Sequence, residues 1–509
     1  MNLDLSTSRD LLTALLPELV LTGWALVLLL VVAWRHRTAG DLRLAGWITL
    51  AGIGSSAVAV WWLWWNAARS EGITPMVAVD DFRYVADFIF LGAAAVTVFF
   101  SFDYLEREQL LAPEYYLLLV FATLGMMLMA GGEDLIVIFL GLELMSVSVY
   151  VLAGIDRRSP RAAEAALKYF LLGAFASAFL LYGVALAYGA TGTTNLTLIG
   201  VQVSSLGLQG SPLLLVGLGL LLVGFGFKVA AVPFHMWAPD VYDGAPTPIT
   251  GFMATAVKAA AFAALARVLI EAFSATASWT SIVTGLAVLT MIVGNLVALA
   301  QRSLKRMLAY SSVAHAGYLL VAVAAGPPPS SQGTAAVLFY LAAYGLTTLA
   351  AFALLAAKGR HGESDVQIDD LAGLSADRPW LAFALAVCML SLLGFPGTAG
   401  FIGKWYILAA AVAAGKGWLA AVLVLASVVS AGYYLPVIMA MYMRQPPFPQ
   451  AHAGVRLGRL GGVALAVCVA AVLYFGVRPN RLLDLAQTSG ATVRPAAGLV
   501  ASPPSPPGN

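Results

Sequence analysis

Four lysines of this chain stand inside long apolar runs, where a charged side chain is unexpected. Lys168, Lys228, Lys258 and Lys404 occur in AAEAALKYFLLGAF, GFGFKVAAVPF, ATAVKAAAF and TAGFIGKWY. An ionisable group at the middle of a bilayer costs roughly 2.5–3.5 kcal/mol on insertion scales, so it needs a partner, water or a function. Because a lysine takes up or releases a proton as its surroundings change, we interpret these four as candidate proton carriers.

A glutamate in the preceding apolar run offers a partner for the first lysine. Glu143 lies in DLIVIFLGLELMSVSVYVLAG, about nine residues from either end, which at about 1.5 Å per residue is near the middle of a membrane. Lys168 lies about two turns into the next run, at a similar depth. We expect these two groups to form a pair whose proton affinity depends on their separation. A static ion pair that fixes the helix register is the alternative.

Helix-breaking residues lie beside two of the lysines. Pro233 follows Lys228 by five residues, and the sequence LLGFPG precedes Lys404. A broken membrane helix leaves backbone groups unpaired and admits water, which allows proton exchange. Histidine side chains can relay protons near neutral pH, so His235 and His315 are candidate proton relays. The alternative for each histidine is a hydrogen-bonded core residue. The alternative for Lys404 is a side chain that snorkels toward the membrane surface.

The composition is that of a membrane protein. Of 509 residues, 61% are hydrophobic and 11% are charged, whereas soluble domains carry about 25% charged residues. The net charge of +2, without a basic stripe interleaved with aromatic residues, argues against nucleic acid as a partner. Cys388 and Cys468 stand alone in apolar runs, and the sequence contains no HExxH, GxSxG or P-loop pattern. We therefore expect no cofactor and no metal site in this chain.

Apolar runs of about 20 residues recur along the chain and predict an all-α fold of about fourteen transmembrane helices. The expected helices are 14–34, 43–66, 82–102, 114–130, 134–154, 162–188, 212–236, 246–271, 279–300, 304–324, 334–357, 379–411, 417–443 and 459–477.

The distribution of basic residues predicts the orientation of these helices. With both termini outside, sixteen of the 28 lysines and arginines fall in inner loops and seven in outer segments, as the positive-inside rule requires. We expect Arg267 to snorkel from the end of its helix. We expect Glu18, Asp87 and Glu133 to lie at outer helix ends that water reaches.

The two interrupted helices lie about 165 residues apart and predict two related repeats of five helices, as in transporters built from inverted repeats. The expected parts are three N-terminal helices (1–113), a first repeat (114–278, broken near 212–243), a second repeat (279–443, broken near 379–411), a final helix (444–477) and a Pro-rich disordered tail (478–509).

These motifs resemble those of a known family. The segments FKVAAVPFHMWAPDVYDGAPTPITGFMATAVKAAAF, FLGLELMSVSVYVLAG, EAALKYFLLGAF, AYSSVAHAGY and LLGFPGTAGFIGKWY are similar to subunit N of the bacterial proton-pumping NADH:quinone oxidoreductase, respiratory complex I. The resemblance covers about residues 10–477. The sister subunits M and L and the large cation/proton antiporter subunits share the architecture, but they carry a different version of PFHMWAPDVYDGAPTP.

The resemblance implies a proton-translocating subunit with two inverted repeats and no prosthetic group. By resemblance, Glu143 and Lys168 form the modulating pair of the inner half-channel. Lys228 is then the proton-accepting lysine on the broken helix, and Lys258 is the central connector. Lys404 faces the outer half-channel.

The resemblance also implies partners and a location. They are the sister subunit M, small membrane subunits and the lipid bilayer of the bacterial inner membrane, with NADH, FMN, iron–sulfur clusters and quinone in other subunits. The chain would be a translocase subunit without its own redox centre. The rival interpretation is a cation/proton antiporter subunit that exchanges sodium or potassium for protons without a redox partner. A structural spacer with an idle channel is a third.

Overall fold

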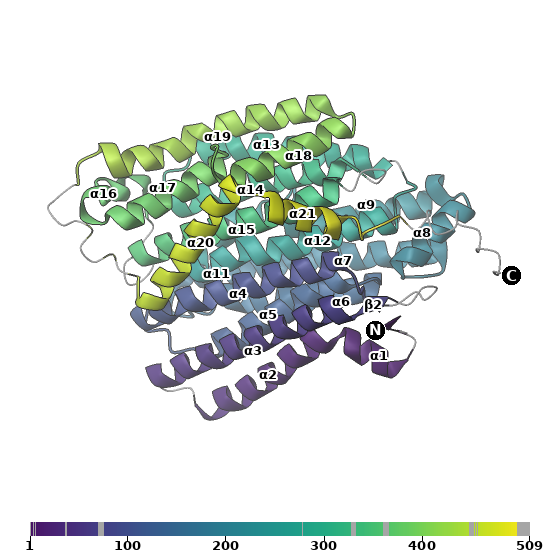
Figure 1. The fold of residues 1–509 in the computed structure, drawn as a ribbon, viewed down its shortest axis with the longest axis horizontal. Coiled ribbons are helices and arrows are strands. Elements are labelled where there is room, and N and C mark those ends of the chain that lie inside the picture. Colours follow the sequence, from purple (N-terminus) through teal and green to yellow (C-terminus); the bar gives the residue numbers. More distant parts are fainter. Residues whose placement is uncertain are drawn as a thin grey trace.

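Long helices that lie roughly side by side make up almost the whole molecule in this computed structural model (Figure 1). The structure describes residues 2–3, 5, 7–35, 38–69, 76–276, 278–326, 332–359, 366–446, 452, 455 and 457–495. Within those ranges, thirteen helices are long and apolar enough to cross a membrane. Two shorter apolar helices, α17 (Pro379–Leu393) and α18 (Ala399–Ala413), together make one further crossing. The predicted all-α fold of about fourteen crossings is confirmed.

Three long helices open the chain. They are preceded by the short helix α1 (Ser8–Ala14), and a two-residue strand, β1 (Asn2–Leu3), pairs in parallel with β2 (Ala68–Arg69). Thr38 and Asp80 cap the second and third of these helices, because each side chain accepts a hydrogen bond from the first turn. The three helices are α2 (Leu16–Trp34), α3 (Ala39–Asn66) and α4 (Asp81–Arg107).

The first expected repeat contains a helix that ends inside the membrane region. Its fourth long helix, α9, stops at Val229, because the next residue, Ala230, takes a left-handed conformation with φ of 59° that ends the helix. The predicted break is therefore present, and it begins three residues before Pro233. The elements of this part are α5 (Glu114–Gly131), α6 (Leu135–Ala153), α7 (Pro160–Thr191), α8 (Leu196–Ser205), α9 (Pro212–Val229), α10 (Trp237–Gly244), α11 (Thr247–Phe252), a π-helical turn (Met253–Val257) and α12 (Lys258–Glu271).

The second expected repeat follows the same order. Its fourth crossing is the pair α17 and α18, interrupted where Gly394 adopts a φ of 87°, a conformation that favours glycine. The other elements are α13 (Ser278–Leu299), α14 (Leu304–Ala324), α15 (Gln332–Lys358), α16 (Leu374–Asp377) and α19 (Gly417–Met443), followed by the final crossing α20 (Arg459–Val477).

Packing also repeats between the two parts. Helix α5 packs on α6 as α13 packs on α14, and α7 packs on α9 as α15 packs on α17 and α18. Because each part contains five crossings, the second begins on the opposite side of the membrane from the first, which is the arrangement of an inverted repeat. The exact boundaries at 114–278 and 279–443 stay a prediction.

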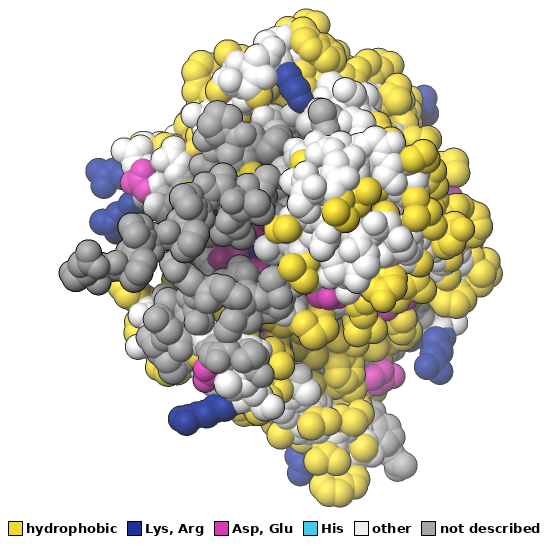
Figure 2. Space-filling model, turned by 90° about the vertical axis from the view of Figure 1, so that its right-hand side faces the viewer, with side chains coloured by type: hydrophobic (Ala, Val, Ile, Leu, Met, Phe, Trp, Pro, Cys, Tyr) yellow, Lys and Arg dark blue, Asp and Glu magenta, His cyan; other side chains and the backbone are white. Residues whose placement is uncertain are grey.

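Three crossings form the centre of the molecule. The most apolar window of the α11–α12 segment is 100% buried, that of α14 is 94% buried and that of α15 is 89% buried. Helices α2 and α3 lie at one edge of Figure 1 and α19 at the opposite edge. An end-on view of the side where α8 lies shows hydrophobic side chains along the upper and right-hand parts of the outline, with Lys and Arg side chains scattered around the periphery (Figure 2). The central helices are thus shielded from lipid by the outer ones.

The chain enters and leaves the bundle at the same end. Arg83, at the start of α4, donates to the backbone oxygen of Ala14 at 3.0 Å, and the backbone nitrogen of Phe82 donates to Thr492 Oγ1 at 3.3 Å. An even number of crossings requires this placement.

The segment after α20 differs from the prediction of a disordered tail. Residues Asn480–Gly490 form helix α21, which packs on α4 and α15. Its apolar side is buried by these helices, so tertiary packing orders a segment whose composition is polar. The Pro-rich end, 496–509, lies outside the described residues.

Candidate proton path

Lys228 occupies the last turn of α9, against one face of α6. Its Nζ donates to Ser146 Oγ at 2.6 Å and to Tyr150 OH at 3.0 Å, and it lies 5.1 Å from the centre of the Tyr150 ring and 5.8 Å from that of Tyr169. Glu143, Ser146 and Tyr150 are spaced by three and four residues, so they share one face of α6. The lysine is 3% exposed. It is solvated by hydroxyls and aromatic rings.

Backbone groups freed by the first break find partners nearby. Trp237 Nε1 donates to the backbone oxygen of Phe227 at 2.9 Å, and the backbone nitrogen of Val232 donates to Thr290 Oγ1 at 3.0 Å. Broken helices persist inside a membrane only when such groups are satisfied. The interruption is therefore supported by the surrounding helices.

Lys258 begins α12 directly after the π-helical turn. Its Nζ donates to the backbone oxygen of Ser312 at 2.6 Å and also contacts Ser312 Oγ. Only 1% of its surface is exposed. π-helical turns often occur at functional positions because they re-aim the side chains that follow.

His315 lies one turn after Ser312 on α14, between two tyrosines. Its Nδ1 is 2.5 Å from Tyr340 OH and its Nε2 is 3.0 Å from Tyr434 OH. Tyr434 OH also bonds to Ser311 Oγ. A histidine with one hydrogen-bond partner on each ring nitrogen is arranged to accept a proton on one side and release it on the other.

Lys404 lies on α18 and reaches back to the end of α17. Its Nζ donates to the backbone oxygens of Leu392 at 2.8 Å and Leu393 at 3.0 Å, and to Ser427 Oγ at 2.9 Å. The ring of Tyr318 lies 4.7 Å away. Carbonyls at a helix C-terminus carry partial negative charge, which favours a cation there. Lys404 is 5% exposed, so it does not snorkel.

Glycine permits the close approach of the two halves of this broken helix. A Cβ on Gly400 would lie 1.9 Å from the backbone oxygen of Ser391. A larger residue there would separate α18 from α17 and move Lys404 away from its carbonyl partners.

We call Lys228, Lys258, His315 and Lys404 the lysine axis. In the described part of the chain, none of its three lysines forms an ion pair with a carboxylate, and every hydrogen-bond acceptor is neutral. Helix α14 supplies Ser312, His315 and Tyr318 at spacings of three residues, so it connects Lys258 to Lys404. Within the described residues, no hydrogen bond joins Lys228 to Lys258, and the two lysines share no hydrogen-bond partner.

The expected pair of Glu143 and Lys168 is not formed. Lys168 Nζ lies 2.7 Å from Glu164 Oε1 and 2.8 Å from Asp240 Oδ2, and its side chain is 41% exposed. Glu143 Oε1 is buried and has no hydrogen-bond partner in the described structure. Lys168 points toward α10, whereas Glu143 lies one turn from Ser146 on α6.

Asp240 connects the Lys168 side chain to a second helix. Its Oδ1 accepts from Arg306 Nη1 at 3.1 Å, in addition to the bond from Lys168 to Oδ2. Partial burial alone would raise the pKa of Asp240, but the hydrogen bonds and charges of Lys168 and Arg306 outweigh burial and lower it. The carboxylate therefore stays ionised at neutral pH.

His235 lies in the first break, apart from the lysine axis. Neighbouring Pro233 and Met236 are exposed, so this segment faces the surface of the chain. His235 Nδ1 is buried without a hydrogen-bond partner. The rings of Tyr318 and Tyr344 link His315 to Lys404 and Lys258, whereas His235 stays outside the axis.

A second set of buried cations lies where α2, α4, α5 and α12 meet. Arg83 Nη2 is 2.6 Å from Glu18 Oε1, and Arg83 Nε is 3.6 Å from Asp87 Oδ2. Arg267 Nη1 is 2.7 Å from Asp80 Oδ2 and 2.9 Å from Glu271 Oε1. We call these six residues the arginine cluster: Glu18, Asp80, Arg83, Asp87, Arg267 and Glu271.

The arginine cluster corrects two expectations. Arg267 is completely buried and paired, so it does not snorkel. Glu18, Asp87 and Glu133 are buried as well, because the starts of α2 and α4 pack against the ends of α5 and α12. Position near a helix end did not produce exposure here.

Sequence reasoning missed the hydroxyls that surround the lysines. Ser146, Tyr150, Ser312, Tyr434 and Ser427 all contact the axis. Ser146 and Tyr150 follow Glu143 at helical spacing, and Ser312 precedes His315 by three residues, so the sequence could have indicated these partners on α6 and α14. The partners from α19 gave no such signal, since α19 lies far along the chain.

The described residues contain no group of three or more His, Cys, Asp or Glu side chains placed to hold a metal ion. Cys388 and Cys468 are both buried and free.

Known proteins similar to this chain come from respiratory and antiporter complexes. Residues 132–430 match the family described as NADH:quinone oxidoreductase/Mrp antiporter, TM. The chain is 45% identical over 483 residues to NADH-quinone oxidoreductase subunit N 2 of Roseiflexus castenholzii, which covers 92% of this chain and 94% of that protein. It is 36% identical to a chain of respiratory complex I from Thermus thermophilus with bound aureothin, with a TM-score of 0.76 over 93% of this chain and 100% of that one. A chain of the Mrp complex from Dietzia sp. shares the fold, with a TM-score of 0.81 at 24% identity over 95% and 97% of the two chains.

Proposed function

This chain belongs to the NADH:quinone oxidoreductase subunit N family, the antiporter-like proton-translocating membrane subunits of complex I, and from that membership we propose that protons pass along its lysine axis. The observation that carries the proposal is that Lys228, Lys258 and Lys404 are buried and hydrogen-bonded only to neutral groups in the described structure. A lysine without a fixed counter-ion gains or loses its proton when a nearby charge changes. Each lysine is thus a switchable proton site.

Glu143 is the group we assign to control the first site. It shares a face of α6 with Ser146 and Tyr150, the two residues that bind Lys228, and its buried Oε1 is not held by another partner in the described structure. An ionised carboxylate that approaches Lys228 favours the protonated lysine, and its withdrawal favours proton release. Lys168, with Glu164 and Asp240, then belongs to the inner entrance rather than to this pair.

The second half provides a route between fixed groups. A proton leaving Lys258 meets the hydroxyl of Ser312, and His315 lies one turn further on with Tyr340 and Tyr434 on its two ring nitrogens. Tyr318 then borders Lys404. Hydroxyls both donate and accept, so they pass a proton without a lasting charge. Transfer between Lys228 and Lys258 needs water or a movement of α12, because no hydrogen bond joins them in the described residues.

The direction and setting of transport complete the proposal. Protons move from the cytoplasm to the outer side, both termini lie outside, and the chain resides in the bacterial inner membrane. Oxidation of NADH and reduction of quinone occur in other subunits, and the sister subunit M and small membrane subunits are neighbours. Basic loops on one side and the presence of similar chains in complex I support this setting.

The experiment uses inverted membrane vesicles that contain the assembled complex. NADH-driven proton uptake is measured by dye quenching for the native chain, for Lys228→Met and for Lys358→Met. Lys358 is a matched control, since it lies at the end of α15 and bonds to His452. We expect proton uptake and NADH oxidation to collapse together in Lys228→Met and to persist in Lys358→Met.

Two outcomes contradict the proposal. Normal uptake in an assembled Lys228→Met complex excludes this lysine as a proton carrier. A different result would be that NADH drives proton uptake in neither sample, whereas an imposed sodium or potassium gradient moves protons in the native chain and not in the variant. The chain would then be a cation/proton antiporter subunit.

A further inference from the structure

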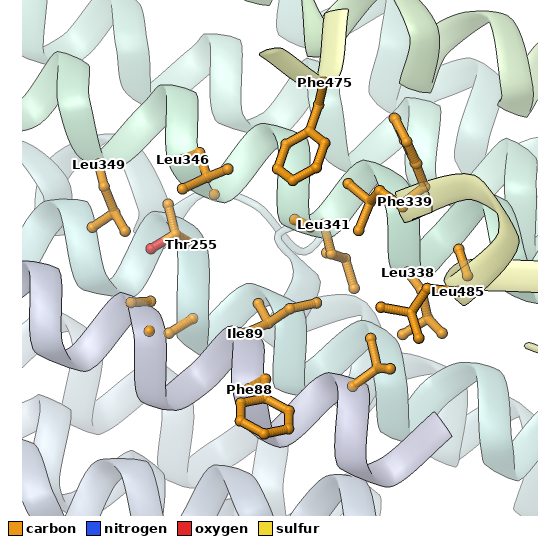
Figure 3. Close-up of a pocket in the computed structure, with 18 of the residues that line it drawn as sticks. Phe88, Ile89, Thr255, Leu338, Phe339, Leu341, Leu346, Leu349, Phe475 and Leu485 are labelled. Carbon is orange, nitrogen blue, oxygen red and sulfur yellow. The ribbon is translucent and has the colours of Figure 1, made fainter. Parts of the chain in front are cut away.

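An apolar cavity of about 420 Å³ lies between α4, α15, α20 and α21, and no residue of the lysine axis lines it. Helix α4 contributes Phe88 and Ile89, α15 contributes Leu341 and Leu346, and α20 contributes Phe475 (Figure 3). Among the lining residues the single hydroxyl, that of Thr255, donates to the backbone oxygen of Gly251 at 2.7 Å. The cavity therefore offers water no free hydroxyl, and apolar cavities of this kind stay dry.

The size of the cavity matches one hydrocarbon chain. A dry apolar cavity of about 150 Å³ accommodates benzene, so 420 Å³ corresponds by proportion to roughly seventeen carbon atoms. On α4 the lining extends from Val85 to Val96, which is about 16 Å along the helix. One leaflet of the hydrocarbon core is about 15 Å thick. A single acyl chain fits both the volume and the depth.

The amphipathic helix α21 lies at the mouth of the cavity. Leu482, Leu485 and Ala486 line the cavity, whereas Asp484 and Gln487 on the opposite face are exposed. A helix of this pattern lies at the level of the lipid headgroups. Phe88, Gly92 and Phe475 keep part of their surface exposed, so the cavity opens toward the lipid.

The charges beside α21 complement a phosphate group. The segment 478–490 contains Arg478 and Arg481, both exposed, against one carboxylate, Asp484. Phe475, which lines the cavity, stands one turn before Arg478. A lipid whose tail enters the cavity would thus place its headgroup near two guanidiniums, which bind phosphate well.

We propose that this cavity binds one acyl chain of an anionic membrane phospholipid from the leaflet at which α21 lies, with the phosphate against Arg478 and Arg481. The tail contacts Thr255 and Ala256 of the π-helical turn, directly before Lys258. An occupied cavity therefore supports the turn that places Lys258 against Ser312.

The test uses phosphatidylglycerol with a photoreactive group near the end of one tail, added to membranes that contain the whole complex. After illumination, labelled peptides are located by mass spectrometry. We expect label on the peptides that contain residues 85–96 and 338–349. Probe-free phosphatidylglycerol in excess removes this label.

Two variants fill the cavity from different helices. A Cβ at Gly92 or at Gly345 would meet nothing within 4 Å, so Gly92→Leu and Gly345→Leu extend into the free space. Each variant abolishes the label while the complex still assembles. Gly54→Leu on α3 is the control, since its Cβ also meets nothing within 4 Å and it does not line the cavity. It keeps the label.

A double variant tests the headgroup. Arg478→Gln with Arg481→Gln reduces labelling by phosphatidylglycerol severalfold and leaves labelling by a phosphatidylcholine probe unchanged. The proposal fails if the native chain takes no label at these peptides, or if the filled variants are labelled like the native chain. It also fails if a helix of another subunit cross-links there in place of lipid.

Discussion

Two groups of buried cations in this chain are stabilised in opposite ways. In the arginine cluster each guanidinium faces carboxylates, as Arg83 faces Glu18 and Arg267 faces Asp80. In the lysine axis each ammonium faces hydroxyls and backbone carbonyls. Helix α12 carries one member of each group, with Lys258 about 14 Å from Arg267 along the helix. The difference therefore arises from local packing.

The difference follows from the chemistry of the two side chains. Arginine keeps its proton under all ordinary conditions, so a buried arginine needs a permanent counter-charge. A buried lysine has a second way to avoid an unpaired charge, which is to release its proton. Permanent pairs fix helices together, and unpaired lysines exchange protons. The arginine cluster is structural on this view, and the lysine axis is functional.

Loss of an arginine should have the largest effect. Arg267→Leu leaves Asp80 and Glu271 buried without their shared partner, and breaking a buried pair in this way costs about 3–5 kcal/mol. We expect little assembled complex in the membrane, measured by native gel electrophoresis and by the temperature at which the purified complex unfolds. Arg267→Lys restores part of the assembly. A stable Arg267→Leu complex that fails only to pump would place the cluster in the proton path.

Loss of a lysine should separate transport from assembly. Lys258→Met removes a buried cation that has no carboxylate partner in the described structure, so the free energy of unfolding stays constant or rises. NADH-driven proton uptake should fall by at least about tenfold. The measurement is dye quenching in inverted vesicles, normalised to the amount of assembled complex. If Lys258→Met reduced assembly as much as we expect for Arg267→Leu, the lysine axis and the arginine cluster would not differ in their roles.

A smaller effect is expected from a single hydroxyl of the axis. Tyr434→Phe removes the partner of His315 Nε2 and of Ser311, and a hydrogen bond contributes about 1 kcal/mol, so proton uptake should slow about fivefold. Tyr116→Phe is the control, because that buried hydroxyl has no hydrogen-bond partner in the described structure. Equal rates for both variants would exclude Tyr434 from the path.

The smallest effect should come from the exposed ion pairs near α10. Asp240→Asn weakens contacts with Lys168 and Arg306 that solvent already screens. We expect less than about a twofold change in proton uptake. The lowered pKa of Asp240 keeps it ionised from neutral pH down to below its ordinary value of 3.8. Any stability that it contributes is therefore present across an assay range of about pH 6 to 9 and is lost only when the pH falls through that lowered pKa.

If the effect of Asp240→Asn on proton uptake changed between about pH 6 and 9, Asp240 would exchange protons during transport. It would then belong with the lysine axis rather than with the permanent pairs.

Much of the fold was predictable because its signals are local. The helix breaks beside Lys228 and Lys404 follow from Pro233 and from the sequence LLGFPG, and both are present. The wrong expectations concern contacts between distant segments. Lys168 bonds to Asp240, 72 residues away, and Arg267 bonds to Asp80, 187 residues away. The order of α21 likewise depends on packing against α4 and α15.

The sequence by itself determined the number of crossings, their breaks and the position of each ionisable residue along its helix, because apolar length and a rise of about 1.5 Å per residue are properties of a single helix. Only the tertiary structure decided which way each side chain points. The central helices are buried on nearly all sides, so the pattern of apolar residues alone does not fix their rotation. Packing between helices sets that rotation, and it separated Lys168 from Glu143, paired the arginines with carboxylates and left the lysines among hydroxyls.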